Sequence, residues 1–306
     1  PGAVQSLLAL LDADETIGIA GSKLVYPDGR LQEAGGILWR DGSGWNYGRG
    51  QDPSLPSFNY VKDVDYVSGA SLMIRRKLWQ EIGGFDDRYA PAYCEDSDLA
   101  LEARRRGRRV VYQPRSVVVH HEGVSHGTDV SDGVKAQQMR NMEILRAKWA
   151  SELAAHFPNG ENVFHARDRS AAKKTILIID HYVPHFDRDA GSRTMQSFIE
   201  TLLDMGLNVK FLGDNFFPHQ PYTEVLEQAG VEVLVGPWIS GRWLEWIREN
   251  GRHLDYALLS RPHIAPKYVQ PLRSHARAGL LYYVHDLHFL RERESARLHN
   301  DALMKE

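Results

Sequence analysis

The chain has 306 residues, with 37 basic and 40 acidic side chains and a formal net charge of −3. This length suits two domains, and the near-neutral charge argues against a nucleic-acid binder held by bulk electrostatics. The single cysteine, Cys94, excludes an internal disulfide and fits a reducing compartment. No apolar run in the sequence is long enough to span a bilayer. Because the chain begins at Pro1 without a methionine, we expect a piece of a longer protein.

The first half mixes helices and strands in no regular order, which is typical of a mixed α/β domain. Turn residues and β-branched runs mark the boundaries of these elements. The predicted elements are a helix over 4–12, two strands within 16–39 around a Pro27-Asp28-Gly29 turn, a loop over 40–53, a buried strand over 63–76, a helix over 94–107, β runs over 108–114 and 116–121, and a helix from about 132 to 157.

Strands and helices alternate at short spacing in the second half, which predicts a parallel sheet with right-handed crossovers. The predicted strands cover 174–180, 208–214, 231–236, 256–260 and 280–286, and the helices cover 193–206, 223–230, 241–250 and about 266–277. Residues 157–173 between the halves have no periodicity, so we place a linker there. The predicted domains are therefore 1–156 and 174–306.

The segment 94–107, CEDSDLALEARRRG, places three carboxylates within a few residues, followed by a basic run and Gly107. A capped helix explains much of this pattern, because acids stabilise the amino end of a helix and bases its carboxyl end. Asp96 in the first turn would also project where a general base meets a substrate hydroxyl, and Glu95 would raise its basicity. Asp98 would cap or bond backbone donors. The segment alone leaves the structural and catalytic interpretations open.

A strand that ends in two histidines follows this helix. His120 and His121 alternate to opposite faces, so at most one of them joins the acids. Carboxylates with one imidazole suit a hard divalent cation that carries a phosphate ligand. Solvent exposure or packing is the alternative for both histidines. Cys94 is more simply a small packed side chain than a reactive thiol, because the neighbouring carboxylates raise a thiol pKa.

Residues 64–129 resemble the C-terminal half of a family-2 glycosyltransferase of the GT-A fold. The matching features are the Ser68-Gly69-Ala70 step, GGFDDRYAPAYCEDSDL over 83–99, VHHEG over 119–123 and, before them, GSKLVYPDGRLQEAGG over 21–36. The resemblance covers about residues 1–150. It implies a GT-A-type mixed sheet and an inverting sugar transfer from a nucleotide-sugar donor.

The same resemblance implies roles for individual residues. The acid that matches Asp96 removes the proton from the acceptor hydroxyl, while a divalent cation (Mg or Mn) neutralises the departing nucleoside diphosphate. The histidine that matches His120 is a ligand of that cation. The small residues Ser68, Gly69 and Ala70 leave room for the acceptor sugar. The loop aromatics Trp45 and Tyr47 would stack on a sugar face or simply pack.

Family members hold the metal and the nucleotide with an Asp-x-Asp motif that would lie before the residue that is Pro1 here. We therefore expect this chain to carry the acceptor half of a truncated GT-A domain and the base, without the donor site. We expect it to be inactive in isolation.

The second half is similar to the N-terminal lobe of a family-4-like GT-B glycosyltransferase, a Rossmann-like fold. The resemblance covers about 174–306, with its motifs in 176–215 and 282–294. It implies acceptor-cleft residues after the first strand, in the next helix and after the last strand, namely His181, Asp189, Gly191, Arg193, His285 and Asp286. Gly191 lies near a helix start, where exposed backbone N–H groups could also bind an anion. Asp214 ends the second strand about twenty residues on, where a dinucleotide site often has a ribose-binding acid. A nicotinamide-dependent oxidoreductase therefore remains an alternative.

We interpret the chain as part of a tandem glycosyltransferase for bacterial surface polysaccharide, O-antigen or capsule. Its partners would be a nucleotide-sugar donor and a glycan or lipid-linked acceptor, with no nucleic acid. The resemblance implies a cytoplasmic place at the inner face of the inner membrane, with peripheral membrane association. The main alternative is a non-catalytic acceptor-binding or scaffold module.

Overall fold

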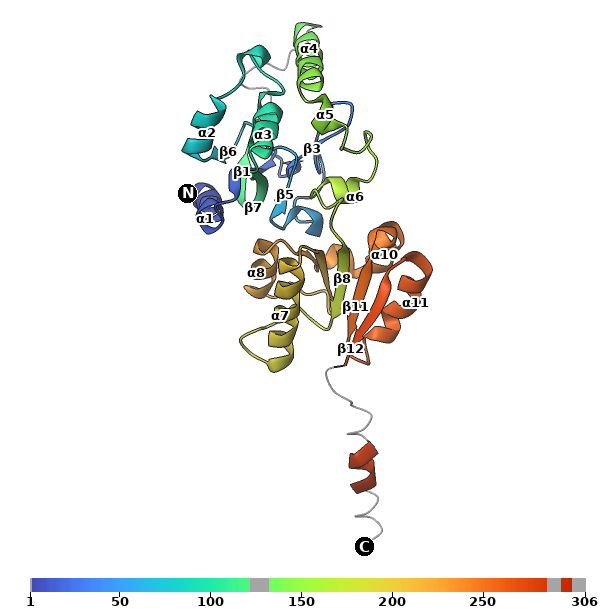
Figure 1. Cartoon of the computed structure of the whole chain (residues 1–306). Helices are drawn as coiled ribbons and strands as arrows, with labels where there is room; N and C mark the ends of the chain where they lie inside the picture. Colours follow the sequence, from blue (N-terminus) through green and yellow to red (C-terminus); the bar gives the residue numbers. More distant parts are fainter. Residues whose placement is uncertain (1, 122–131, 285–292, 299–306) are drawn as a thin grey trace. The chain divides into compact units, whose positions relative to one another are not determined.

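A computed structural model gives the fold and describes residues 2–121, 132–284 and 293–298 (Figure 1). The chain divides into two compact units, residues 1–173 with 224–233 and residues 174–223 with 234–306. The sequence-predicted linker, 157–173, lies within the first unit. None of the described helices is both long and apolar enough to cross a membrane.

The first unit contains a mixed sheet and several short helices. Its elements are α1 Gly2–Ala13, β1 Ile17–Val25, β2 Leu31–Glu33, β3 Gly36–Leu38, β4 Gly44–Asn46, η1 Pro56–Phe58, β5 Lys62–Asp63, β6 Leu72–Ile74, α2 Arg76–Ile82, η2 Asp87–Tyr89, α3 Glu95–Arg105, β7 Arg109–Val119, α4 Asp132–Lys148, α5 Ala150–Leu153 and α6 Val163–Ala166. The sheet order is β2-β1-β7-β5, with β6 also paired to β1. β1 runs parallel to β7 and antiparallel to β2 and β6. β3 and β4 form a separate hairpin.

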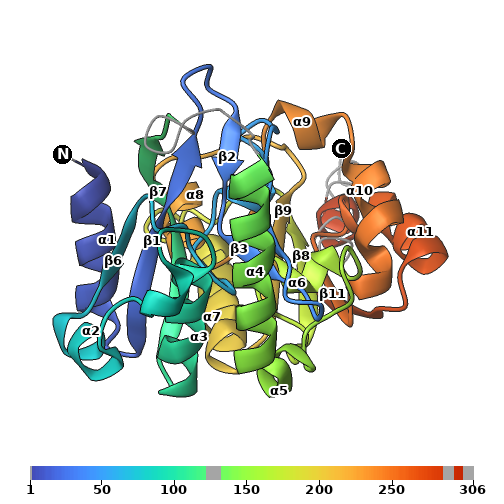
Figure 2. The ribbon, with the colours of Figure 1, turned by 90° about the horizontal axis from the view of Figure 1, so that it is seen from above.

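Helices cover both faces of the central strand pair, and β1 lies between α1 and α3 in Figure 2. Side chains alternate along β1 and β7, as strand geometry requires. Ala20 and Val111 pack in one apolar cluster with Leu7 of α1. Ile19 and Val110 pack in another cluster with residues of α3. This arrangement anchors α3, which carries the acidic segment.

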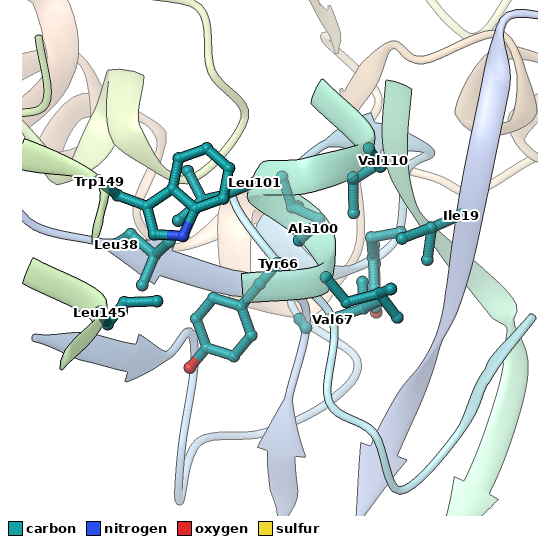
Figure 3. Close-up of a cluster of buried hydrophobic side chains, with 14 of the residues drawn as sticks. Ile19, Leu38, Tyr66, Val67, Ala100, Leu101, Val110, Leu145 and Trp149 are labelled. Carbon is teal, nitrogen blue, oxygen red and sulfur yellow. The ribbon is translucent and has the colours of Figure 1, made fainter. Parts of the chain in front are cut away.

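Trp149 joins α4 and α5 to the core of the first unit. Its side chain is fully buried and packs near Leu38, Leu101 and Leu145 (Figure 3). The predicted helix over 132–157 is therefore interrupted here: α4 ends at Lys148 and α5 is a short separate turn.

Residues 63–76 were predicted to form one strand, but the structure has two strands in this region. β5 pairs with β7 and β6 pairs with β1, and a turn separates them. In that turn Ser71 N–H donates to Ser68 O at 3.2 Å, and Ala70 N–H donates to Ser68 Oγ at 3.2 Å. The polar and small residues therefore lie in the turn before β6, and β5 already ends at Asp63.

Other boundaries differ for local reasons. The predicted loop 40–53 contains β4, which pairs with β3 through Ile37 and Trp45. The two β runs over 108–121 form the single strand β7. Its register against β1 shifts around Pro114, which has no N–H for the ladder.

The second unit and residues 224–233 supply the later elements. These are β8 Thr175–Asp180, α7 Ala190–Asp204, β9 Asn208–Gly213, α8 Tyr222–Gln228, β10 Glu232–Leu234, α9 Pro237–Ser240, α10 Trp243–Asn250, η3 Gly251–His253, β11 Tyr256–Ser260, α11 Ala265–His275 and β12 Gly279–Tyr283. The strand order is β10-β9-β8-β11-β12, with β9, β8, β11 and β12 parallel. All six residues of β8 are buried. The predicted fold class, a mixed α/β sheet followed by a Rossmann-like parallel α/β sheet, is confirmed.

Candidate active site

Two consecutive residues in the left-handed conformation precede α3. Tyr93 and Cys94 have φ angles of 80° and 73°, a region that L-residues rarely adopt. Asp98 N–H donates to Cys94 O at 2.9 Å, so the helix begins directly after this turn. Burial and the three nearby carboxylates raise the pKa of the Cys94 thiol to about 12. The thiol is therefore neutral at physiological pH, as predicted for a packed side chain.

Asp96 lies in the first turn of α3 and is held by backbone donors. Gly69 N–H donates to Asp96 Oδ2 at 3.2 Å, and Ser97 N–H donates to Oδ1 at 2.7 Å. Burial raises the pKa of the Asp96 carboxyl, and these two hydrogen bonds oppose the rise. A carboxylate with a raised pKa is a stronger base, which suits proton abstraction from a hydroxyl.

Glu33, at the end of β2, shares the same loop and was missed by the sequence analysis. Ser68 N–H donates to Glu33 Oε1 at 2.9 Å, while the buried Oε2 has no hydrogen-bond partner among the described residues. Burial raises the pKa of Glu33 to about 8, and the Asp96 carboxyl adds to the rise. Glu33 is therefore mostly protonated at neutral pH. The signal in the sequence is a lone acid in the otherwise uncharged run from Leu31 to Gly36.

Tyr66 lies next to these two acids. Its side chain is buried and packs on Gly36, and its hydroxyl donates to Asn46 Oδ1 at 2.9 Å. Burial, with the Glu33 and Asp96 carboxyls adding to it, raises the pKa of Tyr66 well above its ordinary value. Tyr66 therefore remains a neutral hydrogen-bond donor.

Asp98 belongs to a different environment from Asp96. It is buried and accepts hydrogen bonds from Tyr89 Oη at 3.1 Å, Trp149 Nε1 at 2.7 Å and Lys148 Nζ at 2.9 Å. The expectation that Asp98 bonds backbone donors is thus corrected: its carboxylate joins α3 to α4 and α5 by side-chain contacts. This geometry favours a structural role. Glu95, the third acid, is half-buried.

His120 follows β7 and is half-buried, whereas His121 is exposed. His120 Nδ1 lies 3.0 Å from Gln32 Oε1. An amide oxygen accepts, so this contact suits the tautomer in which Nδ1–H donates to Gln32, the arrangement that leaves Nε2 for a metal ion in metal-binding histidines. Within 2–121, 132–284 and 293–298, no three His, Cys, Asp or Glu side chains gather closely enough to hold a metal ion. His120 contacts Gln32, whereas Asp96 accepts from Gly69 N–H. Ser68, the residue before Gly69, bonds Glu33, so the two contacts reach adjacent residues of β2.

The other predicted residues of the first unit vary in exposure. Gly69 and Ala70 are exposed and Ser68 is half-buried. Trp45 is 41% exposed, with its ring edge-on to Trp39. It therefore keeps ring surface that a ligand can reach.

Tyr47 is packed more tightly. Its ring meets Phe58 at 5.2 Å between centroids, and its hydroxyl accepts from Arg167 Nη1 at 3.1 Å. Packing explains this side chain without a ligand.

In the second unit, residues of the loop after β11 approach two of the predicted residues, His181 and Gly191. Asp189 caps α7 and accepts from Ser192 N–H at 2.7 Å. A Cβ added at Gly191 would lie 3.1 Å from Arg261 Nη2, so Gly191 allows this side chain to approach. Arg193 is exposed.

His181 is exposed and belongs to a group of aromatic side chains. Its ring centroid lies 5.8 Å from that of His263. The predicted His285 and Asp286 lie outside the described residues. Asp214, which kept the oxidoreductase alternative open, bonds Lys267 Nζ at 2.7 Å and Tyr268 Oη at 2.6 Å. Its carboxylate is therefore already engaged.

Comparison with known proteins supports a glycosyltransferase. The sequence model of a family described as "Glycosyltransferase like family 2" matches residues 50–143, which include Ser68, Gly69, Asp96 and His120. The chain is similar to the O-antigen biosynthesis protein RfbC of Myxococcus xanthus, with 30% identity over 121 residues. It is also similar to the N-acetylglucosaminyl-diphospho-decaprenol L-rhamnosyltransferase of Mycobacterium tuberculosis, with 28% identity over 151 residues. An uncharacterized protein of Sinorhizobium fredii is 28% identical over 138 residues.

These similarities are partial in both directions. They cover 37%, 44% and 44% of this chain, and 9%, 48% and 15% of the three relatives in that order. The chain thus spans less than half the length of each of these relatives. Residues 50–143 of the first unit are thus similar to family-2 glycosyltransferases, and two relatives are named for O-antigen biosynthesis and rhamnosyl transfer.

Proposed function

We propose that the first unit is the acceptor half of an inverting hexosyltransferase, which moves a sugar from a nucleotide-sugar to a glycan or lipid-linked acceptor. The observation that supports this most strongly is the carboxylate of Asp96. It has a raised pKa, lies beside the exposed Gly69 and Ala70, and falls within the matched segment.

In the proposed reaction, Asp96 accepts the proton of the acceptor hydroxyl. The acceptor oxygen forms a bond to the anomeric carbon, and the bond from that carbon to the diphosphate oxygen breaks with its electron pair on the diphosphate. Gly69 N–H keeps Asp96 in place during this step. Glu33, being protonated, adds no second negative charge beside the base.

The residues present fit a divalent cation, Mg or Mn, only in part. His120 Nε2 would ligate it in the tautomer in which Nδ1–H donates to Gln32 Oε1, 3.0 Å away. The remaining ligands would come from outside the described residues. When bound, the cation would neutralise charge on the departing diphosphate. We therefore propose that this chain alone does not turn over substrate.

We propose that the second unit is the first lobe of a GT-B glycosyltransferase and contributes to acceptor binding through His181, Asp189, Gly191 and Arg193. We place the chain in the synthesis of bacterial surface polysaccharide, O-antigen or capsule. The names of the relatives favour O-antigen and a polyprenyl diphosphate acceptor, with a rhamnosyl donor as the first to test. Such an acceptor would bring the protein to the cytoplasmic face of the inner membrane as a peripheral protein.

The test is the Asp96→Asn variant in the complete protein that carries this sequence. Transfer from dTDP-rhamnose and other nucleotide-sugars to a polyprenyl-diphosphate N-acetylglucosamine acceptor should fall by about 10²- to 10⁴-fold, the usual contribution of a general base. The matched control is Asp12→Asn, an exposed acid of α1. If Asp96→Asn transfers at the normal rate, the first unit is a non-catalytic acceptor-binding or scaffold module. NADH binding by the second unit would instead favour an oxidoreductase.

A further inference from the structure

A cavity of about 410 Å³ lies at the carboxyl end of α3, away from the Asp96 turn at its amino end. Eight residues of helix separate Asp96 from Arg104, which corresponds to roughly 12 Å along the axis. The cavity has the size of a small-molecule site, whose volumes run from roughly 300 to 1,000 Å³. Its lining comes entirely from residues 38–172 of the first unit. Neither the resemblance nor the proposed reaction uses it.

Two guanidinium groups on the cavity wall bind Asp65, one through its carboxylate and one through its backbone carbonyl. Arg169 Nη1 pairs with Asp65 Oδ1, and Asp65 is buried. Arg104 Nη1 donates to the carbonyl oxygens of Val64 and Asp65, and its buried Nη2 has no partner among the described residues. The cavity wall includes three guanidiniums, of Arg104, Arg105 and Arg169, and two carboxylates, of Asp65 and Glu152, so its formal charge is net positive.

The other carboxylate oxygen of Asp65 is already engaged by other groups. Its Oδ2 accepts from Leu38 N–H at 2.9 Å and lies 3.6 Å from His156 Nδ1. Burial and the charge of Arg169 together lower the pKa of Arg104 to about 10, although the carboxylates of Asp65 and Asp63 oppose this shift. Holding a guanidinium in such surroundings is costly unless an anion compensates it.

Arg169 also adopts a strained backbone. Its φ is 50°, in the left-handed region that non-glycine residues rarely occupy. The conformation directs its side chain to Asp65 and the cavity wall. Strained residues of this kind persist where the surrounding structure requires them, often at ligand sites.

The rest of the wall is mostly apolar and includes Leu38, Leu101 and Phe157. The carboxyl end of α3 adds about half a negative charge, which does not cancel the net positive charge of the wall. An apolar surface beside an uncompensated positive charge suits a ligand with one anionic group on an apolar ring.

We propose that this cavity binds a small organic anion, with its phosphate or carboxylate at Arg104 and Arg169 and its ring against Leu38 and Phe157. The anionic group completes the pairing of the two guanidiniums, and the ring removes apolar wall from water.

The experiment titrates this chain with 1-naphthyl phosphate and with 1-naphthoate, followed by naphthyl fluorescence and by calorimetry. Saturable binding of at least one of them is expected, and the stronger probe identifies the anionic group. Inorganic phosphate and uncharged 1-naphthol should bind at least about tenfold more weakly, because the first lacks the apolar ring and the second lacks the anionic group. Equal binding by either of these, or no binding of both anions at millimolar concentrations, would overturn the proposal.

Variants locate the site. Arg169→Gln should weaken binding about tenfold or more, as expected for loss of a charge-assisted hydrogen bond. Ala155→Trp keeps both arginines but fills the rim of the cavity, and it should abolish binding. Arg108→Gln is the matched control, because Arg108 lines a neighbouring hollow that also contains Arg104 and Arg169, but not this cavity. Thermal unfolding confirms that each variant is folded, and a loss in Arg108→Gln equal to that in Arg169→Gln would contradict the assignment.

Discussion

Glu33 and Asp96 are linked through a single backbone step, because the consecutive N–H groups of Ser68 and Gly69 donate to them at 2.9 and 3.2 Å. The two carboxyls come from β2 and α3, which are far apart in the sequence. The loop between β5 and β6 therefore fixes both acids at once. Any change that moves this loop should alter both carboxyls together.

Glu33 makes the stability of the chain depend on pH. Its pKa is about 8 in the folded chain, compared with an ordinary 4.5. The folded state thus keeps a proton that the unfolded state loses, so the free energy of unfolding should fall as pH rises from about 4.5 to about 8 and then level off. Glu33→Gln should remove this fall and be more stable than the native chain above that range, by up to a few kcal/mol. Urea unfolding at a series of pH values measures this pH dependence of stability. The control is Glu15→Gln, because Glu15 is exposed. Parallel pH profiles for Glu33→Gln and the native chain would refute the assignment.

The Asp98 network should be a major source of stability. Asp98→Ala leaves Trp149 Nε1 buried without its acceptor and removes a partner of Lys148. Breaking a buried pair of this kind costs about 3–5 kcal/mol. Urea unfolding should show this loss, whereas Asp12→Ala on the exposed face of α1 should change stability by less than about 0.5 kcal/mol. A small effect of Asp98→Ala would mean that the network contributes little.

Gly36 provides the space that Tyr66 needs. A Cβ at Gly36 would lie 2.1 Å from Tyr66 Cε1, which is impossible without movement. Gly36→Ala should therefore cost about 1–3 kcal/mol or more and displace Tyr66 from the Glu33–Asp96 pair. Gly241→Ala is the control, since nothing lies within 4 Å of its added Cβ. Thermal unfolding of the two variants distinguishes them, and equal melting temperatures would show that Tyr66 adjusts freely.

Asp189 should stabilise α7 as its N-cap. Its side chain accepts from Ser192 N–H and Ser192 Oγ at 2.7 and 2.6 Å. Asp189→Ala should cost about 1 kcal/mol and speed hydrogen exchange in the first turn of the helix. Asp204, at the opposite end of α7, offers a matched control. Removing an acid from a helix carboxyl end is neutral or slightly stabilising, so Asp204→Ala should show no loss.

The sequence predicted most of the second unit because its signals are local. An apolar strand such as β8 and an amphipathic helix such as α7 can be recognised from a few neighbouring residues. The same applies to the α3 segment and to the turn at Pro27-Asp28-Gly29. The fold class followed from the order of these elements.

Three of the failures depend on contacts between distant residues. Residues 63–76 read as one strand, because nothing local shows that β5 and β6 pair with different strands. The role of Asp98 depends on Trp149, which is 51 residues away. Glu33 was overlooked because its partner, Ser68, is 35 residues away. Periodicity and motif spacing carry no information on such pairs.

The register of β2 limits how this region can vary in length. Gln32 lies at the register shift between β1 and β2, where its amide meets His120, while the next side chain, Glu33, meets the loop at Ser68. Losing one residue from the preceding turn would move Glu33 into the place of Gln32, with an acid facing the imidazole, and Ala34 into the place of Glu33 beside the loop. Insertions and deletions tolerated during evolution should therefore be offset by a bulge at this hairpin.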